Sequence, residues 1–106
     1  MVDFVAFAHT TLELLNSGQF AAVHRQFTDQ LAQALPPETL KAQWEQLHTY
    51  LGAFKGVVDS QHVQSDGVEV VALLLQFEQA RWVLRFHLKD GVVVGMHTFP
   101  AGGSRP

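Results

Sequence analysis

Residues 66–99 read DGVEVVALLLQFEQARWVLRFHLKDGVVVGMHTF, and two Asp-Gly pairs, Asp66-Gly67 and Asp90-Gly91, punctuate this run. An Asp-Gly pair between apolar segments favours a two-residue type I′ turn, because both central residues of that turn need a positive φ. The residues between the pairs are rich in β-branched and aromatic types, which favour strands. This part of the chain is therefore predicted to form antiparallel hairpins.

Working outward from these turns gives four strands, over roughly residues 53–65, 68–78, 81–89 and 92–100. A third turn must join the second strand to the third. We expect it at Gln79-Ala80, although neither residue is a typical turn former. If all three connections are two-residue hairpins, the register of the whole sheet follows.

Helical periodicity dominates the first half of the chain. In residues 4–15 the large apolar side chains fall mostly on one side of a 3.6-residue wheel, with Asp3 as cap and Asn16-Ser17-Gly18 as stop. A second helix should carry Phe20, Val23 and Phe27, and a turn or short helix follows from residue 31 to 35. The last helix starts near Pro37 and ends at Gly52, with an apolar stripe at Leu40, Trp44, Leu47 and Leu51.

The expected register divides the sheet into two faces. One is almost wholly apolar, and the helices must cover it; its third strand supplies Trp82, Leu84, Phe86 and Leu88. On the other face, charges of both signs interrupt apolar residues, and no element remains to cover it. The predicted fold class is therefore α+β, with N-terminal helices packed on one face of a four-stranded antiparallel sheet.

Composition narrows the class of protein. The 106 residues fit one domain, expected over residues 1–100 with a flexible tail at 101–106. Hydrophobic residues make up 47% and the net charge is -3, which argues against a nucleic-acid or anionic-membrane partner. The absence of cysteine excludes disulfides and thiol chemistry. The polar N-terminus does not resemble a signal peptide, so a cytoplasmic location is expected.

The chain resembles a bacterial domain-of-unknown-function family, numbered 3887, over nearly its whole length. The resemblance rests on the order of several features: Phe20 after Gly18-Gln19, the Leu35-Pro36 step, Trp44, Gly52, Leu84 with Phe86, Asp90-Gly91, Gly95 and Pro100. That family looks like part of the nuclear-transport-factor-like superfamily, with the cystatin-like cone fold. The resemblance implies helices closing over a curved sheet around a pocket, and dimers formed sheet to sheet. Superfamily members include isomerases, dehydratases, transport factors and accessory domains.

A pocket is expected between the helices and the apolar sheet face, with His97 on its wall beside Leu84. Gly95, expected opposite Phe86, leaves space there. The other residues expected around this pocket are Ser60, Trp44 and Tyr50. His97 is the candidate general acid or base, or a ligand donor. The alternative is a core histidine with a satisfied hydrogen bond, and the apolar face offers no carboxylate like those of the superfamily's enzymes.

Other candidate chemistry has simpler explanations. The six histidines show no pair at helical i, i+4 spacing and no local cluster with acids, so no metal site is predicted. No glycine-rich phosphate loop is apparent, and no cofactor is predicted. The basic line Arg81, Arg85, His87 and Lys89 is interpreted as a solvated face paired with acids.

The uncovered face predicts self-association. It is expected to present a contiguous apolar patch ringed by charges of both signs, and patches of that kind usually mark interfaces. The expected homodimer interface comprises Val57, Asp59, Leu74, Val83, Arg85, Val94 and Met96. Three functions remain open: a small binding or accessory domain taking an apolar ligand, a small lyase or isomerase using His97, and a pure protein-interaction module.

Overall fold

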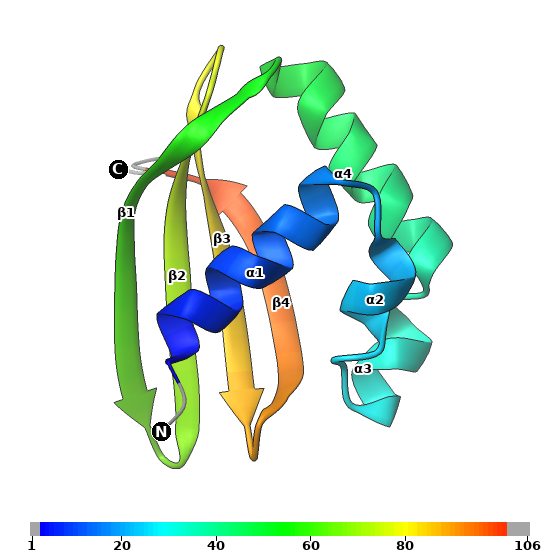
Figure 1. Cartoon of the computed structure of the whole chain (residues 1–106), viewed down its shortest axis with the longest axis vertical. Helices are drawn as coiled ribbons and strands as arrows, with labels where there is room; N and C mark the ends of the chain where they lie inside the picture. The colour runs from blue at the N-terminus through cyan, green and yellow to red at the C-terminus, as the bar shows by residue number, and fades with distance from the viewer. Residues whose placement is uncertain (1–2, 102–106) are drawn as a thin grey trace.

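The computed structural model describes residues 3–101 and shows four helices followed by a four-stranded antiparallel sheet (Figure 1). The helices are α1 (Phe4–Asn16), α2 (Phe20–His24), α3 (Asp29–Ala34) and α4 (Pro37–Leu51). The strands are β1 (Phe54–Ser65), β2 (Val68–Phe77), β3 (Arg81–Lys89) and β4 (Val92–Pro100), in the spatial order β1-β2-β3-β4. The predicted α+β class and element order are confirmed.

Local chemistry explains the ends of the helices. Asp3 caps α1, since its Oδ1 accepts a hydrogen bond from the Ala6 N–H at 3.0 Å. Thr28 caps α3 in the same way through the Leu31 N–H. Pro37 occupies the first turn of α4, and Gly52 ends that helix with a φ of 85°. Of the tail predicted at 101–106, residues 102–106 lie outside the described residues.

Both Asp-Gly pairs form the predicted hairpin turns. Asp66 and Asp90 each have a φ of 53°, and the glycines that follow have φ values near 80°, as a type I′ turn requires. The third turn differs from the prediction. Phe77 N–H donates to the Ala80 carbonyl at 2.9 Å, so the two turn residues are Glu78 and Gln79. The pairing of β2 with β3 is therefore shifted by two residues from the predicted register. Since side chains alternate between the faces with a period of two, the residues of both strands keep their predicted faces.

A bulge in β4 changes the faces of that strand. The pairing runs from Leu88 with Val93 to His87 with Gly95, which leaves Val94 as the extra residue. Met96 therefore pairs with Phe86 on the helix side, whereas the prediction placed it on the uncovered side. Gly95, His97 and Phe99 move the other way, to the uncovered side.

Two further register shifts lie in the first part of β1, at Phe54/Gly56 and Val57/Asp59. They turn Val57 toward the helices, where it packs against the core, so the prediction that it lies on the uncovered face was wrong. Val58 was expected on the covered face and is instead 46% exposed. From Asp59 to Ser65 the predicted pairing with β2 holds without interruption.

All four helices lie on one side of the sheet, with α1 crossing its face (Figure 1). Side chains fill the space between the two layers, and those that are fully buried include Leu73, Phe77, Leu84 and Phe86. The ring of His48 connects α4 to the sheet, at 5.4 Å from the Trp44 ring and 5.5 Å from the Phe77 ring. The two predicted apolar stripes thus meet in one core.

Two backbone connections tie the helical half to the sheet. The segment between α2 and α3 runs beside β4, where Val93 N–H donates to the Gln26 carbonyl and Thr28 N–H donates to the Val93 carbonyl. At the other end, the β2–β3 turn packs on the residues after α4. Glu78 N–H donates to the Ala53 carbonyl, and Ala53 N–H donates to the Glu78 carboxylate at 2.8 Å.

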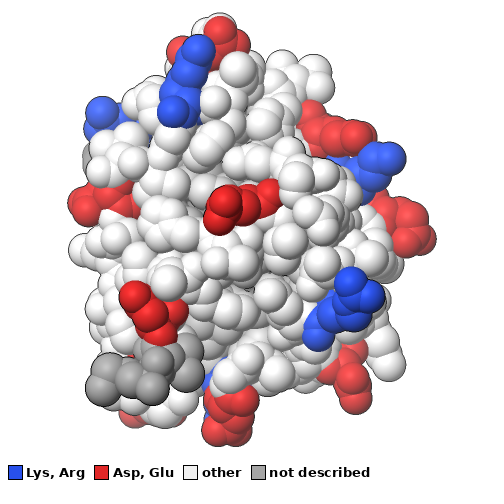
Figure 2. Space-filling view, in the orientation of Figure 1, with Lys and Arg blue, Asp and Glu red and all other residues white. Residues whose placement is uncertain are grey.

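On the helix side, charged side chains of both signs are scattered and none gather into a patch of one sign (Figure 2). Within residues 3–101, no helix is long and apolar enough to cross a membrane.

Candidate functional site

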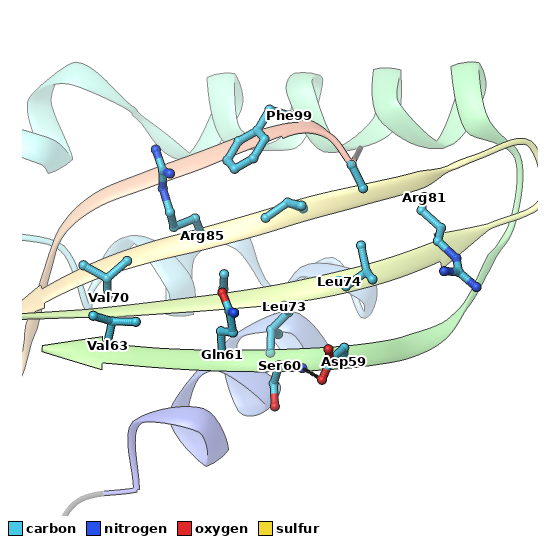
Figure 3. A pocket seen from close by; sticks show the side chains of 13 residues that line it. Asp59, Ser60, Gln61, Val63, Val70, Leu73, Leu74, Arg81, Arg85 and Phe99 are labelled. Atoms are coloured by element: carbon cyan, nitrogen blue, oxygen red, sulfur yellow. Dashed lines mark hydrogen bonds between the residues drawn. The ribbon is translucent and has the colours of Figure 1, made fainter. Parts of the chain in front are cut away.

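The uncovered side of the sheet, here called the open face, carries a hollow of about 690 Å³. Its floor comes from outward-pointing residues of all four strands (Figure 3). The alternation of side chains along each strand places them there. The apolar floor residues are Val63, Val70, Ala72, Leu74, Val83 and Phe99. The structure therefore offers a concave and partly apolar surface on the side that none of the helices α1 to α4 covers.

Five polar residues line the hollow, Ser60 of β1 among them. Arg81 and Arg85 come from β3, and Asp59 and Gln61 come from β1 on the opposite side of the hollow (Figure 3). The Arg81 Nε–H donates to Gln76 Oε1 at 2.8 Å, and Asp59 Oδ1 accepts from the Ser60 N–H at 2.8 Å. The rim thus holds two cations and one anion in an otherwise apolar setting.

Arg85 is the most constrained of these charges. Its guanidinium carbon lies 4.9 Å from the centroid of the Phe99 ring, within the range of a cation–π contact. Its Nε is shielded from solvent and has no hydrogen-bond partner. Among residues 3–101, ion pairs join only Lys55 to Glu78 and His62 to Glu69, so Arg85 has no carboxylate partner there.

A histidine pair lies next to Arg85. The His87 and His97 rings meet edge to face at 5.5 Å, and His97 pairs with Arg85 across the strands. The pKa of His87 lies below its usual 6.5, first because burial penalises the charged form, and then because of the charges of Arg85 and His97. His87 is therefore held neutral to lower pH than an exposed histidine.

This shift makes stability depend on pH with a definite sign. Below about pH 6.5 the unfolded chain protonates His87 more readily than the folded chain does, so the free energy of unfolding falls as pH drops. We expect His87→Gln to lose less stability than the wild type between about pH 7.5 and about pH 5. Urea unfolding at the two pH values measures the difference. Equal losses in the two proteins would contradict the assignment.

The residues predicted around His97 do not come together. Trp44, Leu84 and Phe86 are buried in the core, whereas Gly95 and His97 lie on the open face. Ser60 pairs with Leu73 on the helix side and is exposed. Tyr50 is 74% exposed beside a smaller hollow of about 420 Å³ at the end of α4.

The position of His97 bears on its predicted acid–base role. It is exposed, and within residues 3–101 neither His97 nor His87 has a carboxylate hydrogen-bonded to its ring. The described residues also hold no group of three or more His, Asp or Glu side chains arranged to bind a metal ion. What the face does offer is an apolar floor with fixed charges, which suits binding.

The predicted interface residues divide between the two sides. Asp59, Leu74, Val83 and Arg85 do lie on the open face, and Val94 stands at the β4 bulge, 37% exposed. Val57 and Met96 pack toward the helices. Phe99 belongs to the open face and was missed, because its predicted row assumed that β4 had no bulge. Gly95 inside a strand was the available signal for that bulge.

Comparison with known proteins identifies a family. No curated protein matches the sequence significantly. Residues 8–96 match the family described as "Protein of unknown function (DUF3887)". The match runs from α1 into β4 and so includes most of the strands that form the open face. The chain therefore belongs to this family.

Proposed function

We propose that this chain is a small binding or accessory domain whose working surface is the open face, and that two copies associate through that face. The observation that carries the proposal is the apolar floor on the side of the sheet left without helices. Leu74 and Val83 pair across β2 and β3 at its centre, and neither is fully buried in the single chain. A second sheet would remove these side chains from water.

Charge supports a two-fold arrangement. Asp59 and Arg85 stand on opposite sides of the floor, and neither is in an ion pair within the described residues. A two-fold axis through the floor brings Asp59 of one copy toward Arg85 of the other, twice. Charge pairs of this kind contribute more to the relative orientation of the two copies than to the affinity of the dimer.

The proposal extends to the wider class of the fold. Helices that precede and cover one face of an antiparallel sheet support a place in the nuclear-transport-factor-like superfamily, and a cytoplasmic protein is consistent with the absence of cysteine. A ligand pocket between helices and sheet has less support, because buried side chains fill that space. The open face favours binding over catalysis by His97, since no acid orients that ring within the described residues.

Leu74→Glu tests self-association. An unpaired carboxylate buried at an interface costs several kcal/mol, so the dimer dissociation constant should rise roughly 100-fold or more. Sedimentation velocity across a concentration series measures the constant. Tyr50→Glu is the matched control, because Tyr50 is exposed on α4, away from the open face. The control should dimerise like the wild type. A wild type that stays monomeric at high micromolar concentration refutes the proposal.

A further inference from the structure

We infer that the hollow of the open face binds an apolar monocarboxylate, with Arg85 holding the carboxylate and the floor holding the hydrocarbon body. The inference goes beyond self-association, and one part of it, competition between this ligand and the second copy, rests on the proposed function.

The hollow has the size and lining for such a ligand. Its volume of about 690 Å³ falls within the range of roughly 300–1,000 Å³ typical of small-molecule sites. Five apolar side chains from three neighbouring strands make a continuous floor, namely Val63, Val70, Ala72, Leu74 and Val83. Phe99 extends it to β4. A flexible apolar chain loses its contact with water along this floor.

Arg85 is prepared to receive a carboxylate. The stacking of its guanidinium on Phe99 restricts the side chain before any ligand arrives. A guanidinium presents N–H donors in a planar fork that matches the two oxygens of a carboxylate. Within the described residues neither arginine of β3 has an anionic partner, but the Arg81 Nε–H is already bound to Gln76, whereas Arg85 Nε has no hydrogen-bond partner. The two arginines of β3 are therefore not equivalent.

The rim holds two arginines and one aspartate, so its net charge of +1 is balanced by a ligand with one negative charge. The lowered pKa of His87 keeps that neighbour neutral near pH 7, so Arg85 is not reinforced by a second cation there. Asp59 stands across the hollow and repels a ligand carrying a second negative charge. A phosphate or a dicarboxylate fits this balance less well than a monocarboxylate does.

Ligand and second copy occupy the same floor, so each weakens the binding of the other. A molecule that binds only the single chain shifts the equilibrium toward single chains by mass action. The ligand therefore regulates self-association, with no movement of the fold required.

Isothermal titration of dilute protein with decanoate tests the site, and decanol, with the same chain length and no charge, tests the role of the carboxylate. Wild type should bind decanoate at least about 10-fold more tightly than decanol, as charge-assisted hydrogen bonds predict. Arg85→Gln should lose about 10-fold in decanoate affinity and leave decanol unchanged. Arg25→Gln is the matched control, because it removes the same charge from an exposed arginine outside the hollow, and it should change decanoate affinity less than about twofold. Thermal melting shows whether each variant is folded. Arg85→Lys keeps the positive charge but not the planar fork of donors, so its affinity for decanoate should lie between that of Arg85→Gln and that of the wild type.

Two outcomes overturn the inference: Arg85→Gln binding decanoate like the wild type, or decanol binding wild type as tightly as decanoate. Sedimentation with and without decanoate separates this inference from the proposed function. Arg85-dependent binding by a protein that never dimerises refutes self-association and leaves the ligand site standing. A dimer that decanoate neither binds nor dissociates refutes the ligand site and leaves self-association standing.

Discussion

Phe86→Ala should lower the free energy of unfolding by about 3–5 kcal/mol, the range typical of phenylalanine truncation in a core. Phe86 is fully buried, and it sits in the central part of the sheet between Val71 of β2 and Met96 of β4. Truncation loses the burial of the ring and leaves a cavity that rigid neighbours on two strands cannot fill. Urea unfolding followed by tryptophan fluorescence measures the loss.

Tyr50→Ala is the control for Phe86→Ala. Tyr50 is 74% exposed, so its removal should change the free energy of unfolding by no more than about 0.5 kcal/mol. A loss below about 1 kcal/mol for Phe86→Ala would mean that the helices do not cover this face of the sheet.

Gly52→Ala has the second largest expected effect on stability. Gly52 has a φ of 85° and a ψ of -161°, a conformation open essentially to glycine, which costs another residue roughly 1–3 kcal/mol. An added Cβ would also lie 2.5 Å from Glu78 Oε1 and 2.9 Å from Glu78 Cβ. Glu78 must then move, and its hydrogen bond to the Ala53 N–H, worth about 1 kcal/mol, is lost.

Two further variants separate these costs. Gly18→Ala meets no atom within 4 Å, so it should show only the cost of its own positive φ of 78°, without a clash. Adding Glu78→Ala to Gly52→Ala removes the contact with Oε1, although the contact with the Cβ of residue 78 remains, and should cost less than the sum of the two single changes. If the two changes were strictly additive, the close approach of Glu78 to Gly52 would have no energetic consequence.

The parts of the fold that local chemistry determines were predictable from the sequence. Asp3 as a cap, Gly52 as a stop and the Asp-Gly turns each depend on a few adjacent residues, and all lie where expected. The third turn was misplaced by one residue because its position depends on distant partners. Gln79 N–H donates to the Leu51 carbonyl and Glu78 N–H to that of Ala53, and no short-range pattern encodes such contacts.

The candidate site was less predictable than the fold, since it depends on strand register. Val92, Val93 and Val94 are alike, so alternation in β4 does not reveal which valine is extra. The extra residue comes directly after Val93, whose backbone is hydrogen-bonded to Gln26 and Thr28 of the helical half. This one extra residue places His97 and Phe99 on the open face. His97 therefore does not line the space between the helices and the sheet, where the pocket was predicted.

The hydrogen bonds of Gln26 and Thr28 to Val93 also decide how the sheet can grow. An incoming strand cannot lie along the whole of β4 without displacing that segment, whereas the edge of β1 carries no such block within residues 3–101. The edge of β4 is thus obstructed at Val93, whereas the longer strand β1 offers an edge without that obstruction. Continuous growth of a sheet from chain to chain needs two open edges on each chain, because chains with a single open edge can join only as a pair. An obstruction on one of the two edges of the sheet works against fibre formation by sheet extension.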